Sequence, residues 1–185
     1  INAGSSTDIK GWMYLLKYDT VYHTLSSKFK VQSSKLSDEE RVGILKDAIG
    51  YIIINDKKIP VFSQKEPALL PWKDLNVDVV IESTGHFTTE EKLKAHLTAG
   101  AKKVVLSAPA HSTSSGQANE VSTYVISVND KNYKGEVFIN NASCTTNCIA
   151  PVAKIMVDNF GVEKAMMTTI HGFTSDQRLQ DGGHK

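Results

Sequence analysis

The chain has 185 residues, enough for one domain or for one domain and part of a second. Its 41% hydrophobic and 22% charged residues are typical of globular proteins and exclude a disordered chain, and a net charge of +1 gives no electrostatic reason to expect nucleic acid or an anionic membrane as a partner. No apolar run approaches the roughly 20 residues that a membrane-spanning helix needs.

The first residues predict the end of a strand followed by a polar turn. Residues 1–5 lack an initiator Met and have neither the basic start nor the apolar stretch of a signal peptide, so we expect a chain whose front end is missing. A helix is expected over 8–17, where the apolar residues share one helical face, with Ser6 or Thr7 as its N-cap.

Residues 23–49 are polar and predict a surface insertion with a short helix over 38–48 and no convincing strand. The next two apolar runs, 50–54 and 59–62, flank the turn-forming residues 55–58 and predict a β-hairpin.

A strand–helix–strand unit follows. The continuous apolar runs at 78–81 and 103–106 are typical of strands that are buried on both faces. Between them, a charged helix is expected over 89–99 and should end at Gly100. The expected fold class is therefore α/β, with a parallel sheet covered by helices, although no Gly-x-Gly-x-x-Gly fingerprint occurs in the chain.

The rest of the chain alternates loops, strands and one helix. Residues 111–122 predict a loop, and 124–126 and 136–139 predict further strands. A helical pattern runs over 146–159, and Pro151 lies early in it, where proline is tolerated only near the first turn.

The motif at 141–148 places Cys144 at the start of this helix, where unpaired amides and the helix dipole stabilise a thiolate. Cys148 lies one turn deeper and is expected to be buried and inert. His171, expected on a later strand, is a candidate base toward the thiol. The nearby hydroxyl donors suited to a phosphate or an oxyanion are Ser143, Thr145 and Thr174.

From spacing alone, other interpretations of these residues stay open. A Cys-x-x-x-Cys pair is more often a buried structural pair than a reactive site, and a lone histidine on a strand is usually structural. A zinc site would need a second Cys or His pair with ligand spacing, which the chain lacks, so no metal is expected. A redox switch between Cys144 and Cys148 is a further alternative, and reduced thiols favour a reducing compartment.

The longer string at 142–151, together with 158–161 and 167–171, closely resembles phosphorylating glyceraldehyde-3-phosphate dehydrogenase. The cysteine motif is highly specific, and weaker matches occur in the family's order along nearly the whole chain. These supporting matches are 16–20, 70–72, 82–85, 99–103 and 107–109, while 176–178 and 184–185 look most like bacterial or organellar members.

The resemblance implies a fold and a cellular context. It implies a Rossmann-type NAD(P)-binding domain over 1–143, without its first βα unit and with an insertion near 23–49, and the start of an α+β catalytic domain over 144–185. It also implies that the chain is a fragment. The family's homotetramer and a cytoplasmic location follow from the same resemblance, or an organellar one if a transit peptide was lost.

The resemblance also implies site residues. Cys144 would attack the aldehyde of glyceraldehyde 3-phosphate, with His171 as its base, and inorganic phosphate would open the resulting thioester to give an acyl phosphate. Ser143 and Thr145 match the site of the attacking phosphate, and Thr174 matches the site of the substrate phosphate.

The cofactor implied is NAD or NADP. Many NAD-specific members carry an acidic residue at the place of Ala3 and a bulky Leu-Pro at the place of Gly182-Gly183. Both changes remove obstacles to NADP, so we expect dual or NADP-leaning specificity. Plain packing is the alternative for Thr84, Gly85, Phe87 and Ser107. The expected cofactor-cleft residues are Asn2, Ala3, Lys65, Thr84, Gly85, Phe87, Ser107, Ser175, Gly182 and Gly183.

Two alternative functions stay open. An erythrose-4-phosphate dehydrogenase shares the cysteine motif and the same chemistry. A non-catalytic interaction protein on the same scaffold belongs to a different class, and intact Cys144 and His171 argue against it.

Overall fold

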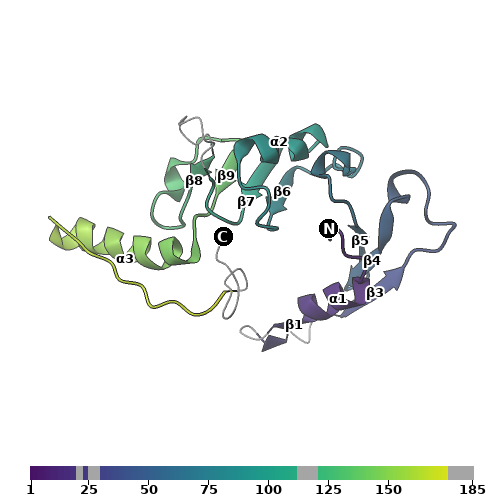
Figure 1. The fold of residues 1–185 in the computed structure, drawn as a ribbon, viewed down its shortest axis with the longest axis horizontal. Coiled ribbons are helices and arrows are strands. Elements are labelled where there is room, and N and C mark those ends of the chain that lie inside the picture. Colours follow the sequence, from purple (N-terminus) through teal and green to yellow (C-terminus); the bar gives the residue numbers. More distant parts are fainter. Residues whose placement is uncertain (20–22, 25–29, 112–120, 175–185) are drawn as a thin grey trace, which may run out of the picture.

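The computed structural model describes residues 1–19, 23–24, 30–111 and 121–174 (Figure 1). The described residues form three α-helices, which are α1 (Ile9–Lys17), α2 (Glu90–Thr98) and α3 (Cys144–Phe160). The described strands are β1 (Tyr18–Asp19), β2 (His23–Thr24), β3 (Val31–Lys35), β4 (Ala48–Ile54), β5 (Lys57–Phe62), β6 (Val79–Glu82), β7 (Lys103–Leu106), β8 (Ser122–Thr123) and β9 (Phe138–Asn140).

Four strands form a parallel sheet in the order β6-β7-β9-β8. The unit β6-α2-β7 confirms the predicted strand–helix–strand pattern. Thr89 caps α2 by accepting a hydrogen bond from the Lys92 amide at 3.4 Å, and Gly100, with a φ of +107°, ends it as expected. The parallel sheet and its crossover helix confirm the α/β fold class.

The helix α2 covers one face of this sheet. Leu93 of α2 is fully buried against Val104 and Leu106 of β7. On the other face, the side chains of Val79 and Ile81 are 48% and 70% exposed. The prediction that these strands are buried on both faces is therefore wrong for β6. The helix α2 covers one face, and no described residue buries Val79 and Ile81 on the other.

A second sheet, β3-β4-β5, is antiparallel and carries α1 on one side (Figure 1). The hairpin between β4 and β5 confirms the prediction, but its turn is shorter than expected. Asn55 and Asp56 alone form the turn, with φ values of +47° and +69°, as two-residue hairpins require. The predicted N-cap of α1 is wrong, since the Asp8 carboxylate accepts from the Gly11 amide at 2.9 Å.

The insertion at 23–49 differs most from the prediction. Instead of a helix over 38–48, there is only a short 3-10 turn at Gly43–Leu45, and Gly43 has a φ of +56°. A strand that was not predicted, β3, pairs with residues 50–54 of β4. Its middle residues are polar, so no apolar alternation marks it, and its pairing depends on backbone hydrogen bonds to a neighbour far along the chain.

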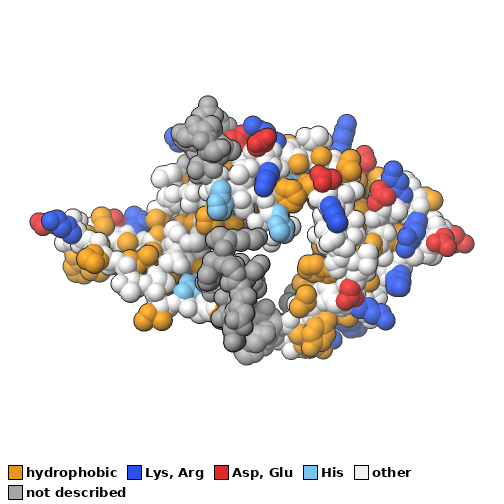
Figure 2. Space-filling model, viewed as in Figure 1, with side chains coloured by type: hydrophobic (Ala, Val, Ile, Leu, Met, Phe, Trp, Pro, Cys, Tyr) orange, Lys and Arg blue, Asp and Glu red, His pale blue; other side chains and the backbone are white. Residues whose placement is uncertain are grey.

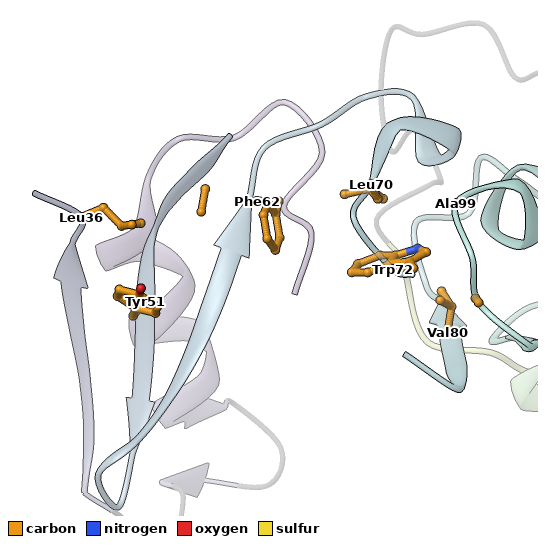
Figure 3. Packing of buried hydrophobic residues seen from close by; sticks show 9 residues of the cluster. Leu36, Tyr51, Phe62, Leu70, Trp72, Val80 and Ala99 are labelled. Atoms are coloured by element: carbon orange, nitrogen blue, oxygen red, sulfur yellow. The ribbon is translucent and has the colours of Figure 1, made fainter. Parts of the chain in front are cut away.

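The two sheets are joined by one core cluster (Figure 3). Tyr51 and Phe62 enter it from the antiparallel sheet, and Val80 enters from the parallel sheet. Trp72 lies between Leu70 and Val80, so its ring belongs to the side of the cluster that supports the parallel sheet.

The region before α3 corrects two further expectations. The strand expected over 124–126 is wrong, because β8 ends at Thr123 and the chain turns at Ser127, which has a φ of +65°. The helix α3 begins two residues earlier than predicted and contains Pro151 in its interior.

None of the residues of α3 is buried among the described parts of the chain, and hydrophobic side chains gather along it in Figure 2. Among the described residues, no helix is long and apolar enough to cross a membrane.

Candidate active site

The turn from β9 into α3 is built around a buried asparagine. Asn140 is 1% exposed, and its amide nitrogen donates to the Thr123 hydroxyl at 2.9 Å and to the Val121 carbonyl at 3.2 Å. Its side-chain oxygen accepts from the Ala142 amide at 2.9 Å. This last bond holds Ala142 at a φ of +61°, a backbone conformation that costs a non-glycine residue about 1–2 kcal/mol.

Cys144 follows this strained turn and is the first residue of α3. Ser143 is the N-cap, and its hydroxyl accepts from the Thr146 amide at 3.0 Å. The Asn147 side chain donates to the carbonyls of Asn141 and Ser143 at 2.6 and 2.9 Å and ties the first turn of the helix to the preceding loop. The prediction of a cysteine at a strand-to-helix turn is confirmed.

Cys144 lies against His171. The Sγ and Nε2 atoms are 3.2 Å apart, and both side chains are exposed. The Gly172 carbonyl lies 2.6 Å from Nδ1 of the same ring. A carbonyl only accepts hydrogen bonds, so Nδ1 carries a proton and Nε2 of the neutral ring is free to accept the proton of the thiol. The expected strand at His171 is wrong, because 162–174 pairs with no described strand.

The pKa values of the pair shift in opposite directions. The hydrogen bond from His171, assisted by the Thr145 side chain, lowers the pKa of the Cys144 thiol. The Gly172 carbonyl, followed by Cys144 itself, raises the pKa of His171. Both shifts favour a thiolate beside an imidazolium, which is the reactive form of a cysteine nucleophile.

The expected phosphate-binding hydroxyls have different positions. Thr145 is half-buried beside Cys144. The Ser143 oxygen already serves as the helix cap and also pairs with the Thr146 hydroxyl at 2.8 Å. Thr174 is half-buried at the end of the last described segment.

The second cysteine corrects a prediction. Cys148 was expected to be buried, but it is exposed, because α3 buries none of its residues against the described chain. Both cysteines are free thiols. Within the ranges that the structure describes, no three His, Cys, Asp or Glu side chains gather as metal ligands.

Three expected cofactor residues lie at the carboxyl ends of parallel strands, the edge at which such sheets bind nucleotides. Thr84 and Gly85 follow β6, Ser107 follows β7, and all three are exposed. Gly85 has a φ of +73°, and no atom lies within 4 Å of the place where a Cβ would stand, so the backbone is open to a ligand there. Phe87 is instead half-buried, with its ring 6.3 Å from that of His96.

The remaining cofactor predictions have mixed outcomes. The Asn2 side chain is engaged by the Gln64 main chain, at 2.9 and 3.0 Å, and Lys65 is exposed. Ala3 is buried against the core of the antiparallel sheet, so it leaves no open space itself. The space lies one residue on, at Gly4, where nothing comes within 4 Å of a Cβ position. Ser175, Gly182 and Gly183 lie outside the described residues.

A buried polar chain beneath Thr84 was not predicted. The Trp72 indole nitrogen lies 3.2 Å from Nδ1 of His96, and Nε2 of His96 lies 3.0 Å from the Glu82 carboxylate. The other carboxylate oxygen accepts from the Thr84 amide at 2.7 Å and from the Thr84 hydroxyl. A signal for it existed in the sequence, since a glutamate ends an apolar strand and a histidine follows Leu93 on the buried side of a helix.

Comparisons with known proteins identify the family of this chain. A family model described as "Glyceraldehyde 3-phosphate dehydrogenase, NAD binding domain" matches residues 1–90, and one described as "Glyceraldehyde 3-phosphate dehydrogenase, C-terminal domain" matches 143–185. Relatives named glyceraldehyde-3-phosphate dehydrogenase are 43% identical in Clostridium acetobutylicum, over 97% of this chain and 47% of the relative, and 46% identical in Mycobacterium tuberculosis, over 100% of this chain and 49% of the relative. The chain thus spans about half the length of the curated relatives it matches. The chain belongs to the glyceraldehyde-3-phosphate dehydrogenase family.

Proposed function

We propose that the protein carrying this chain is an NAD(P)-dependent dehydrogenase that oxidises glyceraldehyde 3-phosphate and transfers the acyl group to inorganic phosphate, giving 1,3-bisphosphoglycerate. The observation that carries the proposal is the 3.2 Å approach of Cys144 Sγ to His171 Nε2 at the start of α3. The names of the relatives supply the substrate.

In the proposed mechanism, Cys144 is the nucleophile and His171 is its base. His171 Nε2 takes the thiol proton, and Cys144 sulfur forms a bond to the aldehyde carbon while the carbonyl oxygen gains a proton. A bound NAD(P) supplies the acceptor for the hydride that leaves this carbon. His171 takes the hydroxyl proton as the carbonyl re-forms, which leaves a thioester on Cys144. A phosphate oxygen then attacks the thioester carbon, the carbon–sulfur bond breaks, and the thiolate is restored.

The hydroxyl groups beside the cysteine have separate proposed roles. Thr145, half-buried next to Cys144, and Ser143 bind the attacking phosphate, and Thr174 binds the phosphate already on the substrate. Ser143 can do so through its hydroxyl proton, because its oxygen is the acceptor in the helix cap.

The cofactor lies at the carboxyl edge of the parallel sheet in this proposal. The exposed Thr84, Gly85 and Ser107 support binding there, and the open Gly85 backbone suits a close approach. We propose that NADP is accepted as well as NAD. The residues after Asn2 carry no acidic side chain until Asp8, and the open Gly4 together with exposed Ser5 offers space and a hydrogen-bond donor to a 2′-phosphate.

The domain division and assembly are proposed on the family resemblance. The cofactor domain ends at residue 143 and the catalytic domain begins at 144, where α3 starts. The whole protein is proposed to be a cytoplasmic homotetramer. Size-exclusion chromatography with light scattering on the full-length protein checks the tetramer, and a monomeric mass contradicts it.

The experiment that tests the function is an initial-rate assay on the full-length protein with glyceraldehyde 3-phosphate and inorganic phosphate. We expect activity that depends on phosphate and is lost in Cys144→Ser. Activity with erythrose 4-phosphate alone contradicts the proposed substrate, and activity with neither aldehyde supports a non-catalytic role. A catalytic efficiency with NAD a hundredfold or more above that with NADP contradicts the proposed NADP acceptance.

A further inference from the structure

The buried, hydrogen-bonded series Trp72–His96–Glu82 ends at the edge of the parallel sheet where the cofactor is proposed to bind. Glu82 and His96 are only 3% and 4% exposed, and Trp72 is buried in the core cluster beside Leu70 and Val80 (Figure 3). An ionised carboxylate is costly to bury unless hydrogen bonds satisfy it. Here Glu82 receives three: one from His96 and two from Thr84.

The donor and the acceptor of each hydrogen bond between Trp72, His96 and Glu82 are fixed. An indole N–H is only a donor, so Nδ1 of His96 must accept from Trp72 and carries no proton. The neutral ring then has its proton on Nε2, which donates to the Glu82 carboxylate. Trp72 thereby fixes the tautomer of His96. In that tautomer Nε2 is a donor, so the residue at position 82 must offer an acceptor to it.

Glu82 bonds to Thr84 through its side chain and to Ser107 through its main chain. Its side chain fixes the Thr84 amide and hydroxyl, and the Thr84 oxygen in turn accepts from the His86 amide at 3.2 Å. Its main-chain carbonyl accepts from the Ser107 amide at 2.9 Å. Both Thr84 and Ser107 are exposed at the edge where the dinucleotide is proposed to bind.

We propose that Trp72, His96 and Glu82 form a buried positioning relay that holds the Thr84–His86 turn in the conformation that receives the dinucleotide. This inference rests on the proposed function and adds to it three buried residues that support the cofactor-binding edge. The three side chains are buried, so each acts through Thr84.

The relay predicts an unusual pattern of mutational effects. In Glu82→Gln, the carboxamide has one acceptor oxygen and one NH2 group, so an orientation that suits Thr84 makes the NH2 group face the Nε2 proton of His96. His96 can relieve this conflict only by moving its proton to Nδ1, where it would meet the Trp72 N–H. Trp72→Phe removes that second conflict, so the double variant can restore the bonds to Thr84.

The test measures the dissociation constants of NAD and NADP by titration calorimetry for the full-length protein, both single variants and the double variant. We expect Glu82→Gln to bind roughly ten- to a hundredfold more weakly, and Trp72→Phe to lose less than about fivefold because His96 still donates to Glu82. The double variant should bind at least about fivefold more tightly than Glu82→Gln. In steady state, the KM for dinucleotide should rise while the KM for the aldehyde stays unchanged.

Asp78→Asn makes the same carboxylate-to-amide change just before β6, in an exposed ion pair with Lys102, and should leave affinity unchanged. A double variant that binds no better than Glu82→Gln, or that fails to fold, overturns the relay. Unchanged affinity in Glu82→Gln also overturns it. A wild-type protein that binds neither dinucleotide overturns the proposed function itself, and the relay with it.

Discussion

Cys144 Sγ and His171 Nε2 lie 3.2 Å apart although the two residues are 27 positions apart along the chain. One residue starts a helix whose residues are not buried among the described parts of the chain, and the other lies in an extended segment without a described strand partner. Three local groups orient the thiol and the imidazole: the Asn140 side chain beneath the turn, the Ser143 hydroxyl at the helix cap, and the Gly172 carbonyl beside the imidazole. The pairing is therefore fixed by hydrogen bonds close to each residue.

Replacing His171 should make Cys144 less reactive at low pH. In His171→Ala the hydrogen bond that lowers the pKa of the thiol is lost, so that pKa should rise toward its ordinary value. A thiol with a pKa near 8.5 is only about 1% thiolate at pH 6.5, and the rate of alkylation by iodoacetamide should fall accordingly. His111→Ala, at another exposed histidine, should leave the pH profile unchanged. Equal alkylation profiles in wild type and His171→Ala would contradict the pairing.

Removing the Asn140 side chain should destabilise the turn that carries Cys144. Asn140→Ala leaves the Ala142 amide and the Val121 carbonyl without their partners in a buried place, and should lower the free energy of unfolding by about 1–3 kcal/mol. Denaturant unfolding measures this. Asn159→Ala, on the exposed end of α3, should change stability by less than about 0.5 kcal/mol. Similar losses in both variants would argue against a special role for Asn140.

The core beneath α2 should be sensitive to truncation. Leu93 is fully buried against β7, so Leu93→Ala should lower the free energy of unfolding by about 2–5 kcal/mol. The matched change Leu15→Ala, on an exposed position of α1, should cost at most about 0.5 kcal/mol. Thermal or denaturant unfolding of both variants checks the difference.

Glu82 should make stability depend on acid. Burial alone would raise the pKa of this carboxyl, but the hydrogen bonds from His96 and Thr84 outweigh it, so the pKa lies below its ordinary value. The stability that Glu82 contributes is then present above the pKa of the unfolded chain and is lost as pH falls through the lower folded pKa. The free energy of unfolding should decline less steeply in acid for Glu82→Gln than for wild type. Parallel curves would contradict this assignment.

Features with a local pattern could be predicted from the sequence. The β6-α2-β7 unit follows from two apolar runs around a capped helix, and the hairpin follows from Asn55-Asp56 between strands. The cysteine at the start of α3 follows from a motif confined to consecutive residues. Each of these depends on neighbours within a few positions, which is where sequence patterns carry information.

Features that depend on distant partners could not be predicted in this way. The strand β3 is polar and exists because β4 offers it backbone partners. The relay joins Trp72 to His96 across 24 residues and His96 to Glu82 across 14, so no spacing rule identifies it. Burial also depends on what covers a surface, which explains why the exposure of Cys148 and of Ile81 was predicted wrongly.

The proposed thioester on Cys144 is tested most directly by rapid mixing of the full-length protein with glyceraldehyde 3-phosphate and dinucleotide in the absence of phosphate. We expect a burst of reduced dinucleotide close to one equivalent per Cys144, an increase in intact mass equal to the acyl group, and release of that group when phosphate is added. No burst, or a burst of the same size in Cys144→Ser, would contradict it.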